Sequence, residues 1–314
     1  MRTKITNLTH EEFLKLRTGI GGSDSGSILG LSEYVSRYEL WGIKAGLYEP
    51  NFYDSNFSFF GRYFEESVAD LYTYWGGAFE DLLENYNNKK RIVEIEDDIY
   101  HYSDDEYPFL QCSPDRIILK HYKYEGQGVL EVKTIAGFVA DKYEAGIPPQ
   151  YYAQMQHNMM VTGLKWGDFA ILKDGREFDV FHIQRNEEFI ADLKQRELIF
   201  WNQVQLTKKC IEANMPYTEY EPEIDGTEAF AKFLKRQYRG DEETIYADPE
   251  DKENAMIYDS CSKEIKEIEK KKQLAQNNLM FKMKDATVMV IDEFSKITYR
   301  PDVNGNRRFN LKLK

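Results

Sequence analysis

A carboxylate and an ammonium group lie two residues apart in the segment GVLEVKTI, residues 128–135. Side chains alternate between the two faces of a strand, so Glu131 and Lys133 share one face, and Leu130 and Val132 share the other. Burying an unpaired charge costs on the order of several kcal/mol, so the charged face needs a partner or a metal. We therefore predict a buried strand with an apolar face for the core and an ionic face available for chemistry.

A second carboxylate precedes this strand. Asp115 lies in the segment CSPDRII, and fifteen residues separate it from Glu131, about the length of an adjacent antiparallel strand and a turn. The two carboxylates are therefore expected to meet at one end of a sheet. Carboxylate oxygens and a backbone carbonyl suit Mg²⁺ or Mn²⁺, and Lys133 could orient and help to deprotonate a water molecule whose pKa the metal lowers. The same spacing is equally consistent with a Glu–Lys pair on a solvent-facing edge strand.

Two amphipathic segments could add side chains to such a site. Residues 59–77 are predicted to form a helix, because apolar residues recur at helical spacing and two glycines end the segment. Its Glu65 could supply a third carboxylate or could face water. The helix predicted over residues 148–163 has one polar face, which could line a cleft or face solvent. The residues of that face are Tyr151, Gln154 and Asn158.

The stretch GIGGSDSG, residues 19–26, concentrates small residues before a short predicted helix. It is not a dinucleotide-binding fingerprint, because Asp24 occupies the third glycine position and no strand precedes it. No lysine follows it, so it is not a P-loop either. Consecutive small residues can still cradle a phosphate through backbone N–H groups. Taken alone, the stretch is better explained as an ordinary glycine-rich turn.

The remaining patterns place these residues in a mixed framework of helices and strands. Short strands are predicted over residues 91–135, a hairpin around KDGR follows the second amphipathic helix, and a long helix is predicted over residues 187–212. Residues 10–18 and 36–46 are also helical in pattern. A helix, a cluster of strands, a helix and a hairpin are typical of an α/β or α+β core.

The composition changes after Pro216. Acidic, turn-rich stretches lead to a second long helix predicted over residues 251–282, followed by a hairpin over residues 288–300 and a basic C-terminal stretch. One apolar stripe runs along the helix. Its members are Ile257, Cys261, Ile265, Ile268, Ala275 and Leu279. We therefore expect two domains, residues 1–215 and residues 216–314, the second being an appendage of helix and hairpin.

The composition of the whole chain narrows the class of protein. The 314 residues are 42% hydrophobic and 14% aromatic, which is typical of a globular chain, and no apolar run reaches the ~18 residues of a membrane span. Three widely separated cysteines predict a reducing cytoplasm rather than a disulfide framework. The net charge of −13 argues against a protein coated in nucleic acid, but it allows a local basic groove.

Five segments, in a fixed order along residues 10–185, resemble the YqaJ-type viral recombinase nucleases, the family that includes phage lambda exonuclease. The segments are LKLRTGIGGSD, ILGLSEYVSRYELWGIKAG, FGRYFEESVADLY, the pair CSPDRI and LEVKT, and IPPQYYAQMQHNMMVTG. The third segment resembles the family's Gly-x-x-x-Glu helix and places its glutamate at Glu65 rather than Glu66. The fourth resembles the Pro-Asp…Glu-x-Lys core of restriction-endonuclease-like nucleases.

The resemblance implies an α/β fold with a restriction-endonuclease-like PD-(D/E)xK core, in which helices flank a central mixed β-sheet. The helix and hairpin of the C-terminal region would be appended to this core. The activity implied is that of a Mg²⁺-dependent 5′→3′ exonuclease, with Mn²⁺ able to replace Mg²⁺. Such an enzyme acts on double-stranded DNA ends, releases mononucleotides and leaves 3′ single-stranded tails for recombination by strand annealing.

The resemblance also implies a role for each matching residue. The metal ligands would be Glu65, Asp115, Glu131 and the carbonyl of Val132, and Lys133 would position the attacking water. The 5′ phosphate would be held by Arg17, Ser23, Ser113 and Gln154. Tyr151 and Gln156 match the motif helix and would support the site where DNA binds.

Relatives of this kind form trimeric rings, so the resemblance implies a homotrimer that encloses DNA and needs a basic surface only on its inner wall. A single-strand annealing protein would be its partner, in the cytoplasm of the host cell if the chain is encoded by a phage or prophage. Two alternatives stay open: a structure-specific endonuclease of the same fold, and a non-catalytic protein that binds DNA ends during recombination. The presence of Asp115, Glu131 and Lys133 together argues against the second.

Overall fold

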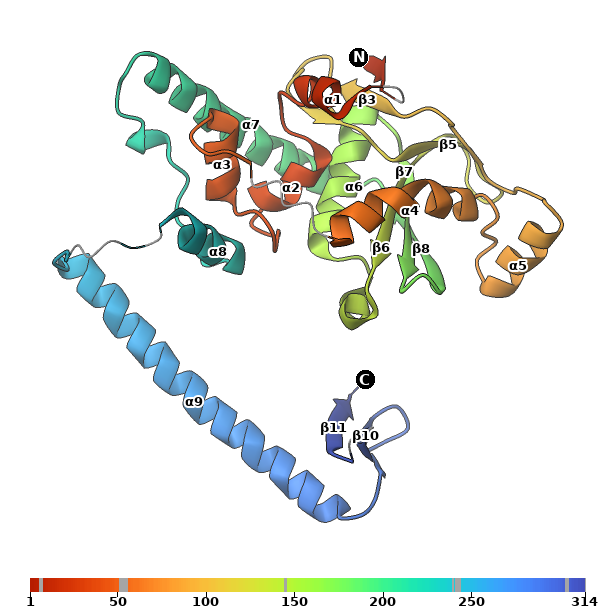
Figure 1. Ribbon diagram of the computed structural model, residues 1–314, viewed down its shortest axis with the longest axis vertical. Coiled ribbons are helices and arrows are strands. Elements are labelled where there is room, and N and C mark those ends of the chain that lie inside the picture. The colour runs from red at the N-terminus through yellow and green to blue at the C-terminus, as the bar shows by residue number, and fades with distance from the viewer. Residues whose placement is uncertain are drawn as a thin grey trace. The chain divides into compact units, whose positions relative to one another are not determined.

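The computed structural model describes residues 1–5, 8–50, 56–143, 146–238, 240, 244–302 and 305–313. Contacts within the chain divide it into two compact units, Met1–Arg239 and Gly240–Lys314 (Figure 1).

A five-stranded mixed sheet forms the centre of the first unit, in the order β2-β5-β6-β7-β8. The strands span Glu94–Ile95 (β2), Arg116–Lys120 (β5), Gly128–Ile135 (β6), Trp166–Lys173 (β7) and Glu177–Gln184 (β8). β6 and β7 run parallel, and the other neighbouring strands run antiparallel. The predicted mixed sheet and the hairpin formed by β7 and β8 are thus confirmed.

The helices α4 (Asn56–Tyr72) and α6 (Pro149–Thr162) flank this sheet (Figure 1). The core cluster beneath α4 contains Leu130 and Val132 of β6. The neighbouring residues of β6 belong to the other face, whose core cluster is built with methionines of α6. β6 therefore alternates as predicted, and its ionic face, which includes Glu131, is turned toward α6.

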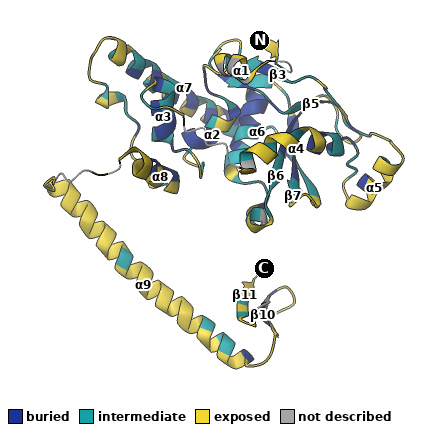
Figure 2. Cartoon of the chain, viewed as in Figure 1, coloured by how far each residue is buried: buried dark blue, intermediate teal, exposed yellow. Residues whose placement is uncertain are grey.

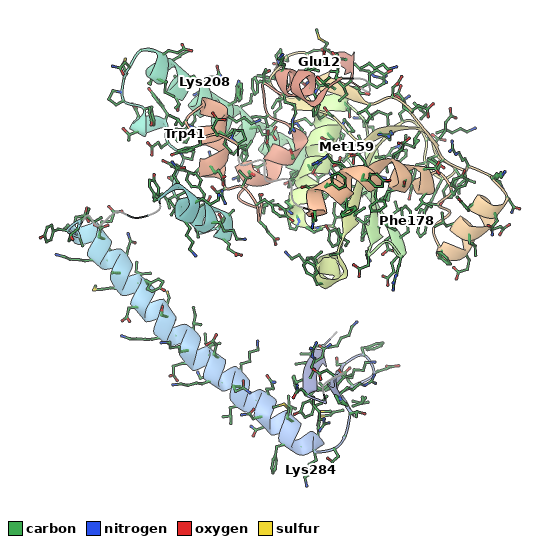
Figure 3. All side chains as sticks on the ribbon, viewed as in Figure 1. Glu12, Trp41, Met159, Phe178, Lys208 and Lys284 are labelled. Atoms are coloured by element: carbon green, nitrogen blue, oxygen red, sulfur yellow. The ribbon has the colours of Figure 1, made fainter. Side chains whose placement is uncertain are left out.

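A layer of helices next to α6 consists of α2 (Gly22–Ile28), α3 (Arg37–Ala45) and α7 (Glu187–Glu212). α2 packs against α6, and α3 packs against α7, where the Trp41 indole N–H donates to Thr207 Oγ1 over 3.1 Å (Figure 3). α7 spans the residues that the sequence predicts for it. This layer supports the N-terminal segment that carries the glycine-rich stretch.

A small sheet in the order β1-β3-β4 borders that segment. Its strands span Arg2–Lys4, Tyr100–Ser103 and Gln111–Cys112. Between α1 (His10–Leu16) and α2, Ile20 forms a parallel bridge with Leu110, just before β4. The close approach requires a glycine, because a Cβ at Gly19 would lie 2.0 Å from the Phe109 carbonyl oxygen. The bridge brings the glycine-rich stretch beside the residues that lead into β5.

The helix α8 (Glu228–Gln237) belongs to the first unit, although the sequence predicts a domain boundary after residue 215. Its Phe230 and Phe233 are buried, with ring centroids 5.4 and 6.0 Å from that of Tyr38 on α3. This aromatic contact joins residues far apart in the sequence, which is why the composition change after Pro216 does not coincide with the division at residue 239.

Two further differences concern helix boundaries. α4 begins at Asn56, before the start of the helix predicted over residues 59–77, and residues 51–55 lie outside the described residues. It ends at Tyr72, earlier than predicted, and the glycines at 76 and 77 then lead into the helix α5 (Phe79–Asn87), which was not predicted.

The second unit consists of the long helix α9 (Pro249–Met283) and an antiparallel sheet in the order β11-β10-β9. The strands span Val288–Val290 (β9), Lys296–Pro301 (β10) and Arg307–Lys312 (β11). Figure 2 shows that most of α9 is exposed, and Met283 is its one buried residue among those described. The apolar stripe predicted along this helix therefore faces solvent over most of its length. Among the described residues, no helix combines the length and apolar character that crossing a membrane requires.

Candidate active site

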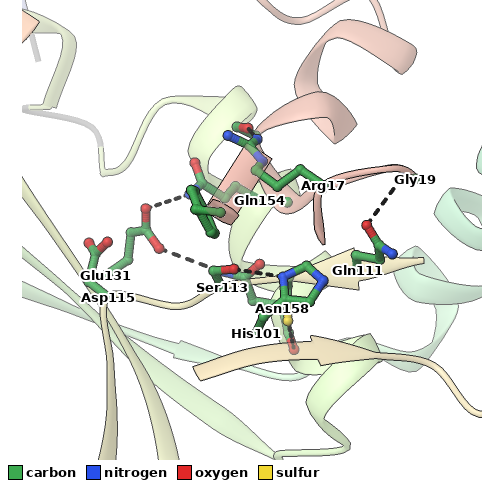
Figure 4. Close-up of a pocket in the computed structure, with 14 residues that line it drawn as sticks. Arg17, Gly19, His101, Gln111, Ser113, Asp115, Glu131, Gln154 and Asn158 are labelled. Carbon is green, nitrogen blue, oxygen red and sulfur yellow. Dashed lines mark hydrogen bonds between the residues drawn. The ribbon is translucent and has the colours of Figure 1, made fainter. Parts of the chain in front are cut away.

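One cavity of the first unit collects most of the residues that the sequence selects (Figure 4). Its volume is about 170 Å³, and its walls come from the glycine-rich segment, the residues that join β4 to β5, the strand β6 and the helix α6. The predicted site residues that line it are Arg17, Ser23, Ser113, Asp115, Glu131 and Gln154.

Asp115 and Glu131 meet because β5 and β6 pair antiparallel, with Arg116 opposite Leu130. Asp115 lies just before β5, and its Oδ2 accepts a hydrogen bond of 2.8 Å from the backbone N–H of Val132. The N–H and C=O groups of one strand residue point to the same side of the strand, so the Val132 carbonyl points to the side of β6 on which β5 lies. The predicted pairing of carboxylates at one end of a sheet is thus present, with the Val132 backbone beside it.

Glu131 is 2% exposed and is hydrogen-bonded through both carboxylate oxygens. Lys133 Nζ donates to Oε1 over 2.6 Å, and Gln154 Nε2 donates to the same oxygen. Asn158 Nδ2 donates to Oε2 over 3.4 Å. Burial, followed by repulsion from Asp115, raises the pKa of Glu131 to about 7. Gln154 and Asn158, two residues of the predicted polar face of α6, therefore point at Glu131 and not at bulk water.

Lys133 is held as a cation. Burial acts to lower its pKa, but the carboxylates of Glu131 and Asp115 outweigh burial and raise the pKa above its ordinary value. A protonated ammonium group has three donors and no lone pair. Lys133 can therefore orient an oxygen atom and stabilise negative charge, but it cannot accept a proton in this state. Its position favours a role in placing water over a role in deprotonating it.

Glu65 of α4 is the third member of the acidic group. Burial, followed by repulsion from Asp115, raises its pKa to about 7, and its Oε1 lies 3.8 Å from Arg116 Nη1. The neighbouring Glu66 is exposed. The electrostatic coupling of Glu65 to the carboxylate pair agrees with its selection over Glu66.

The donor set suits a divalent cation by its chemistry. No group of three or more His, Cys, Asp or Glu side chains in the described ranges is placed to hold a metal ion as it stands. However, Glu65, Asp115 and Glu131 offer hard carboxylate oxygens of the kind that Mg²⁺ and Mn²⁺ prefer. Asp115 raises the pKa of both glutamates, and a cation between the three would remove that repulsion. The residues therefore fit a magnesium-type ion.

The opposite wall of the cavity carries an exposed guanidinium group. Arg17 Nη2 donates to Ser23 Oγ over 3.3 Å. The turn between them is fixed by Asp24, whose Oδ2 accepts from the Gly21 N–H over 2.9 Å and lies 2.8 Å from Lys44 Nζ. Asp24 thus has a structural role, and Arg17 is the cation that faces the cavity.

His101 and Gln111 line the cavity but were not selected from the sequence. His101 Nδ1 lies 3.0 Å from Ser113 Oγ, and burial, followed by the charge of Arg17, lowers the pKa of the imidazole. Gln111 Oε1 accepts from the Gly19 N–H over 3.1 Å. No spacing in the sequence marks these two residues, because the small sheet brings them to the cavity through pairings between distant segments.

Gln156 and Tyr151 lie elsewhere on α6. Gln156 is fully buried, where its Nε2 donates to the Gln184 carbonyl and its Oε1 accepts from the Asn186 N–H, both over 2.8 Å. It ties α6 to the connection between β8 and α7 and cannot reach a phosphate, so its grouping with DNA-binding residues is corrected to a structural role. Tyr151 packs against Phe169, with ring centroids 5.4 Å apart, and so supports α6 from outside the cavity.

Comparisons with known proteins give both family and fold matches. Residues 12–165 match the family model of the YqaJ-like viral recombinase domain. The uncharacterized protein YqaJ of Bacillus subtilis (strain 168) is 28% identical over 317 residues, which cover 99% of this chain and 89% of that protein.

Among solved structures, the alkaline exonuclease LHK-Exo of Laribacter hongkongensis matches with a TM-score of 0.51 and 18% identity, over 66% of this chain and 97% of the exonuclease. The complex of LHK-Exo with dAMP matches with a TM-score of 0.51 and 17% identity over the same shares. These likenesses confirm the predicted restriction-endonuclease-like fold.

Proposed function

We propose that the chain is a deoxyribonuclease of the alkaline exonuclease type, a proposal supported by the match of residues 12–165 to the family model of the YqaJ-like viral recombinase domain. It degrades double-stranded DNA from its ends in the 5′→3′ direction, with Mg²⁺ as its cofactor, and leaves 3′ single-stranded tails. The observation that carries the proposal is the meeting, in one cavity, of half-buried Asp115 and buried Glu131 with the exposed guanidinium of Arg17. Lys133 contacts Glu131 at this point over 2.6 Å.

Each residue around the scissile phosphate has a distinct role in hydrolysis. A bound Mg²⁺ would offset charge on the phosphoryl oxygens and lower the pKa of a water molecule. Asp115 is fixed by the Val132 N–H, and Glu131 is fixed by amides of α6, so neither carboxylate needs to reorganise during the reaction. Lys133, protonated beside Glu131, donates a hydrogen bond to the attacking water. It also stabilises the negative charge that develops on the phosphoryl oxygens.

The 5′ phosphate binds at the opposite wall. Arg17 and Ser23 already contact each other, and a guanidinium offers a forked pair of donors to phosphate oxygens. Ser113, which is held by His101, completes this side of the cavity. Each cleavage exposes a new 5′ phosphate, so binding at Arg17 draws the strand forward by one nucleotide.

A duplex labelled separately at each 5′ and 3′ end tests the reaction. Early release of the 5′ label as a mononucleotide, with the 3′ label retained, is the expected result. Internal cuts in a covalently closed duplex would instead favour a structure-specific endonuclease of the same fold. Binding of DNA ends with no hydrolysis in Mg²⁺ or Mn²⁺ would favour the non-catalytic scaffold.

Arg17→Ala should remove the preference for phosphorylated ends. Wild-type protein is expected to degrade a 5′-phosphorylated duplex faster than a 5′-hydroxyl duplex, and the variant should degrade both at the slower rate. Hydrogen bonds to charged groups contribute ~1.5–3 kcal/mol, which corresponds to about 10–100-fold in kcat/KM. Arg196→Ala is the matched control, because Arg196 is exposed and pairs only with Asp192 among the contacts described. Equal wild-type rates on the two ends would exclude a phosphate site at Arg17.

The proposed assembly is a homotrimeric ring that encloses the duplex. A ring explains how a chain with a net charge of −13 digests a polyanion, because only its inner wall must attract phosphate. Analytical ultracentrifugation should give three times the monomer mass at micromolar concentration. A monomer that still removes thousands of nucleotides in one binding event would contradict the ring. The 3′ tails would then pass to a single-strand annealing protein, and the host cytoplasm is the proposed location.

A further inference from the structure

The C-terminal sheet, β9–β11, carries cations opposite one another on a single face. Direct cross-strand partners point to the same side of a sheet, and the register pairs Lys296 with Lys312 and Arg300 with Arg308. Between these pairs, Thr298 lies opposite Asn310. All four cations are exposed, and the three strands contain no Asp or Glu. We call this surface the basic face of the C-terminal sheet.

Two like-charge pairs across one ladder are unfavourable in the isolated protein, because like charges directly opposite each other destabilise a sheet. In the part of the chain that the structure describes, Arg308 has one acidic neighbour, Asp302, 3.4 Å away, and is still 82% exposed. No ion pair involves Lys296, Arg300 or Lys312 among the same residues. An anionic partner on this face would relieve the repulsion.

Arg307 shows by contrast what a structural arginine does in this sheet. It lies on the opposite face, where it donates to the carbonyls of Lys284, Ala286 and Tyr299 and stacks 3.8 Å from the centroid of the Tyr299 ring. Lys284 follows the last residue of α9 (Figure 3). With Ile297 fully buried, this face holds the sheet against the end of the helix. The basic face is therefore presented outward on a fixed support.

The spacing of the cations fits the backbone of duplex DNA. Lys296 and Arg300 are four residues apart on β10, which separates the two cross-strand pairs by about 13 Å. The major groove of B-DNA is about 12 Å wide, so the pairs could contact phosphates on its two sides. Tyr299 and Phe309 belong to the opposite face, and the basic face has no aromatic side chain on which an unpaired base could stack.

We propose that the basic face of the C-terminal sheet is a second DNA-binding site, which contacts the phosphate backbone of duplex DNA without reading its sequence. DNA as the ligand rests on the proposed function, but the site lies outside the catalytic cavity and needs no DNA end. The first unit repels DNA at long range, since residues 1–239 contain 39 acidic and 27 basic residues. A backbone contact in the second unit would offset that repulsion and keep the protein on its substrate.

The test uses the full chain and a duplex closed at both ends by hairpin loops, in buffer with a chelator. Such DNA has no terminus to enter the cavity and is not cut. Binding is measured by fluorescence anisotropy from 50 to 200 mM salt. The test variant replaces Lys296, Arg300, Arg308 and Lys312 by Gln. The control variant replaces four lysines of α9 by Gln, which changes the charge of the same unit equally. These are Lys252, Lys266, Lys271 and Lys282.

The test variant should bind about 10–100-fold more weakly at 50 mM salt, and the slope of log K against log [salt] should fall by up to about 3–4, since each phosphate contact contributes about 0.9. Its thermal stability should stay level or rise, because the repulsion is gone.

Equal affinity of wild type and test variant would overturn the proposal, and so would an equal loss in the α9 control. Loss of self-association without loss of DNA binding would also overturn it and would assign the face to the acidic surface of another copy. If neither wild type nor the test variant digests linear DNA, but both bind the closed duplex as expected, the proposed nuclease function is wrong and the proposed DNA-binding site is still supported.

Discussion

Replacing Lys133 by alanine should lower the rate of DNA hydrolysis by about 10²–10⁴-fold and leave DNA binding nearly unchanged. Groups that place or polarise a reacting water contribute in this range. Lys133 is the only side-chain ammonium within hydrogen-bonding distance of Glu131 among the described residues, at 2.6 Å. Single-turnover rates on a 5′-phosphorylated duplex, together with binding measured in Ca²⁺ or chelator, separate the effect on chemistry from any effect on affinity.

Lys142→Ala is the control for this experiment. Lys142 is also a lysine in an ion pair, with Glu33, but both partners are about half exposed and lie outside the cavity. A second variant, Lys133→Met, keeps the length of the side chain and guards against loss of packing around Glu131. Hydrolysis at near wild-type rate by both Lys133 variants would show that the assignment of the active site is wrong.

The site was predictable where chemistry follows a local rule. Alternation along β6 fixes which side of the strand Glu131 occupies, and an antiparallel partner strand brings Asp115 to it; both rules act over fewer than about twenty residues. The structure agrees at each point. The bounds of α6 also follow from local signals, since Pro148 and Pro149 mark its start and Gly163 ends it with φ 75°.

Other features of the structure depend on contacts between residues far apart in the sequence, so no local sequence pattern predicts them. His101 reaches the cavity through pairing of β3 with β4, and nothing in its own neighbourhood marks it. α8 is anchored by Phe230 on Tyr38, a contact across almost two hundred residues, so the composition change at Pro216 suggested an earlier boundary. The prediction for Gln156 had a different difficulty. The motif identified the correct helix, but it did not show in which direction the Gln156 side chain points.

The carboxylates offer a test with two independent measurements. Asp115→Asn and Glu131→Gln should each reduce hydrolysis in Mg²⁺ by at least about 10³-fold, because each removes a charge from the site where a metal would supply several kcal/mol of charge stabilisation. The substitutions keep the size of the side chain. Glu66→Gln is the matched control, since Glu66 adjoins Glu65 on α4 and is exposed. Full activity of either site variant, or of wild type in excess chelator, would contradict the metal assignment.

The second measurement is the free energy of unfolding without metal as a function of pH. The direction of its change with pH follows from the pKa values. Burial and Asp115 raise the pKa of Glu131 to about 7, and burial and Asp115 do the same for Glu65, whereas an unfolded glutamate titrates near 4.3. Between these values the folded state binds more protons than the unfolded state, so metal-free stability should fall as pH rises from about 4.5 to 7 and level off above.

Glu131→Gln should therefore flatten this pH dependence and make the metal-free protein more stable than wild type at pH 8. Mg²⁺ should raise the melting temperature of wild type at pH 8 more than at pH 5, because at pH 5 protons compete for the carboxylates. The variant should gain little from Mg²⁺ at either pH. If Mg²⁺ raised the melting temperature of wild type and Glu131→Gln equally, the ion would be binding elsewhere. In that case Lys133 and the amides of α6 would hold the buried Glu131 carboxylate for a structural reason alone.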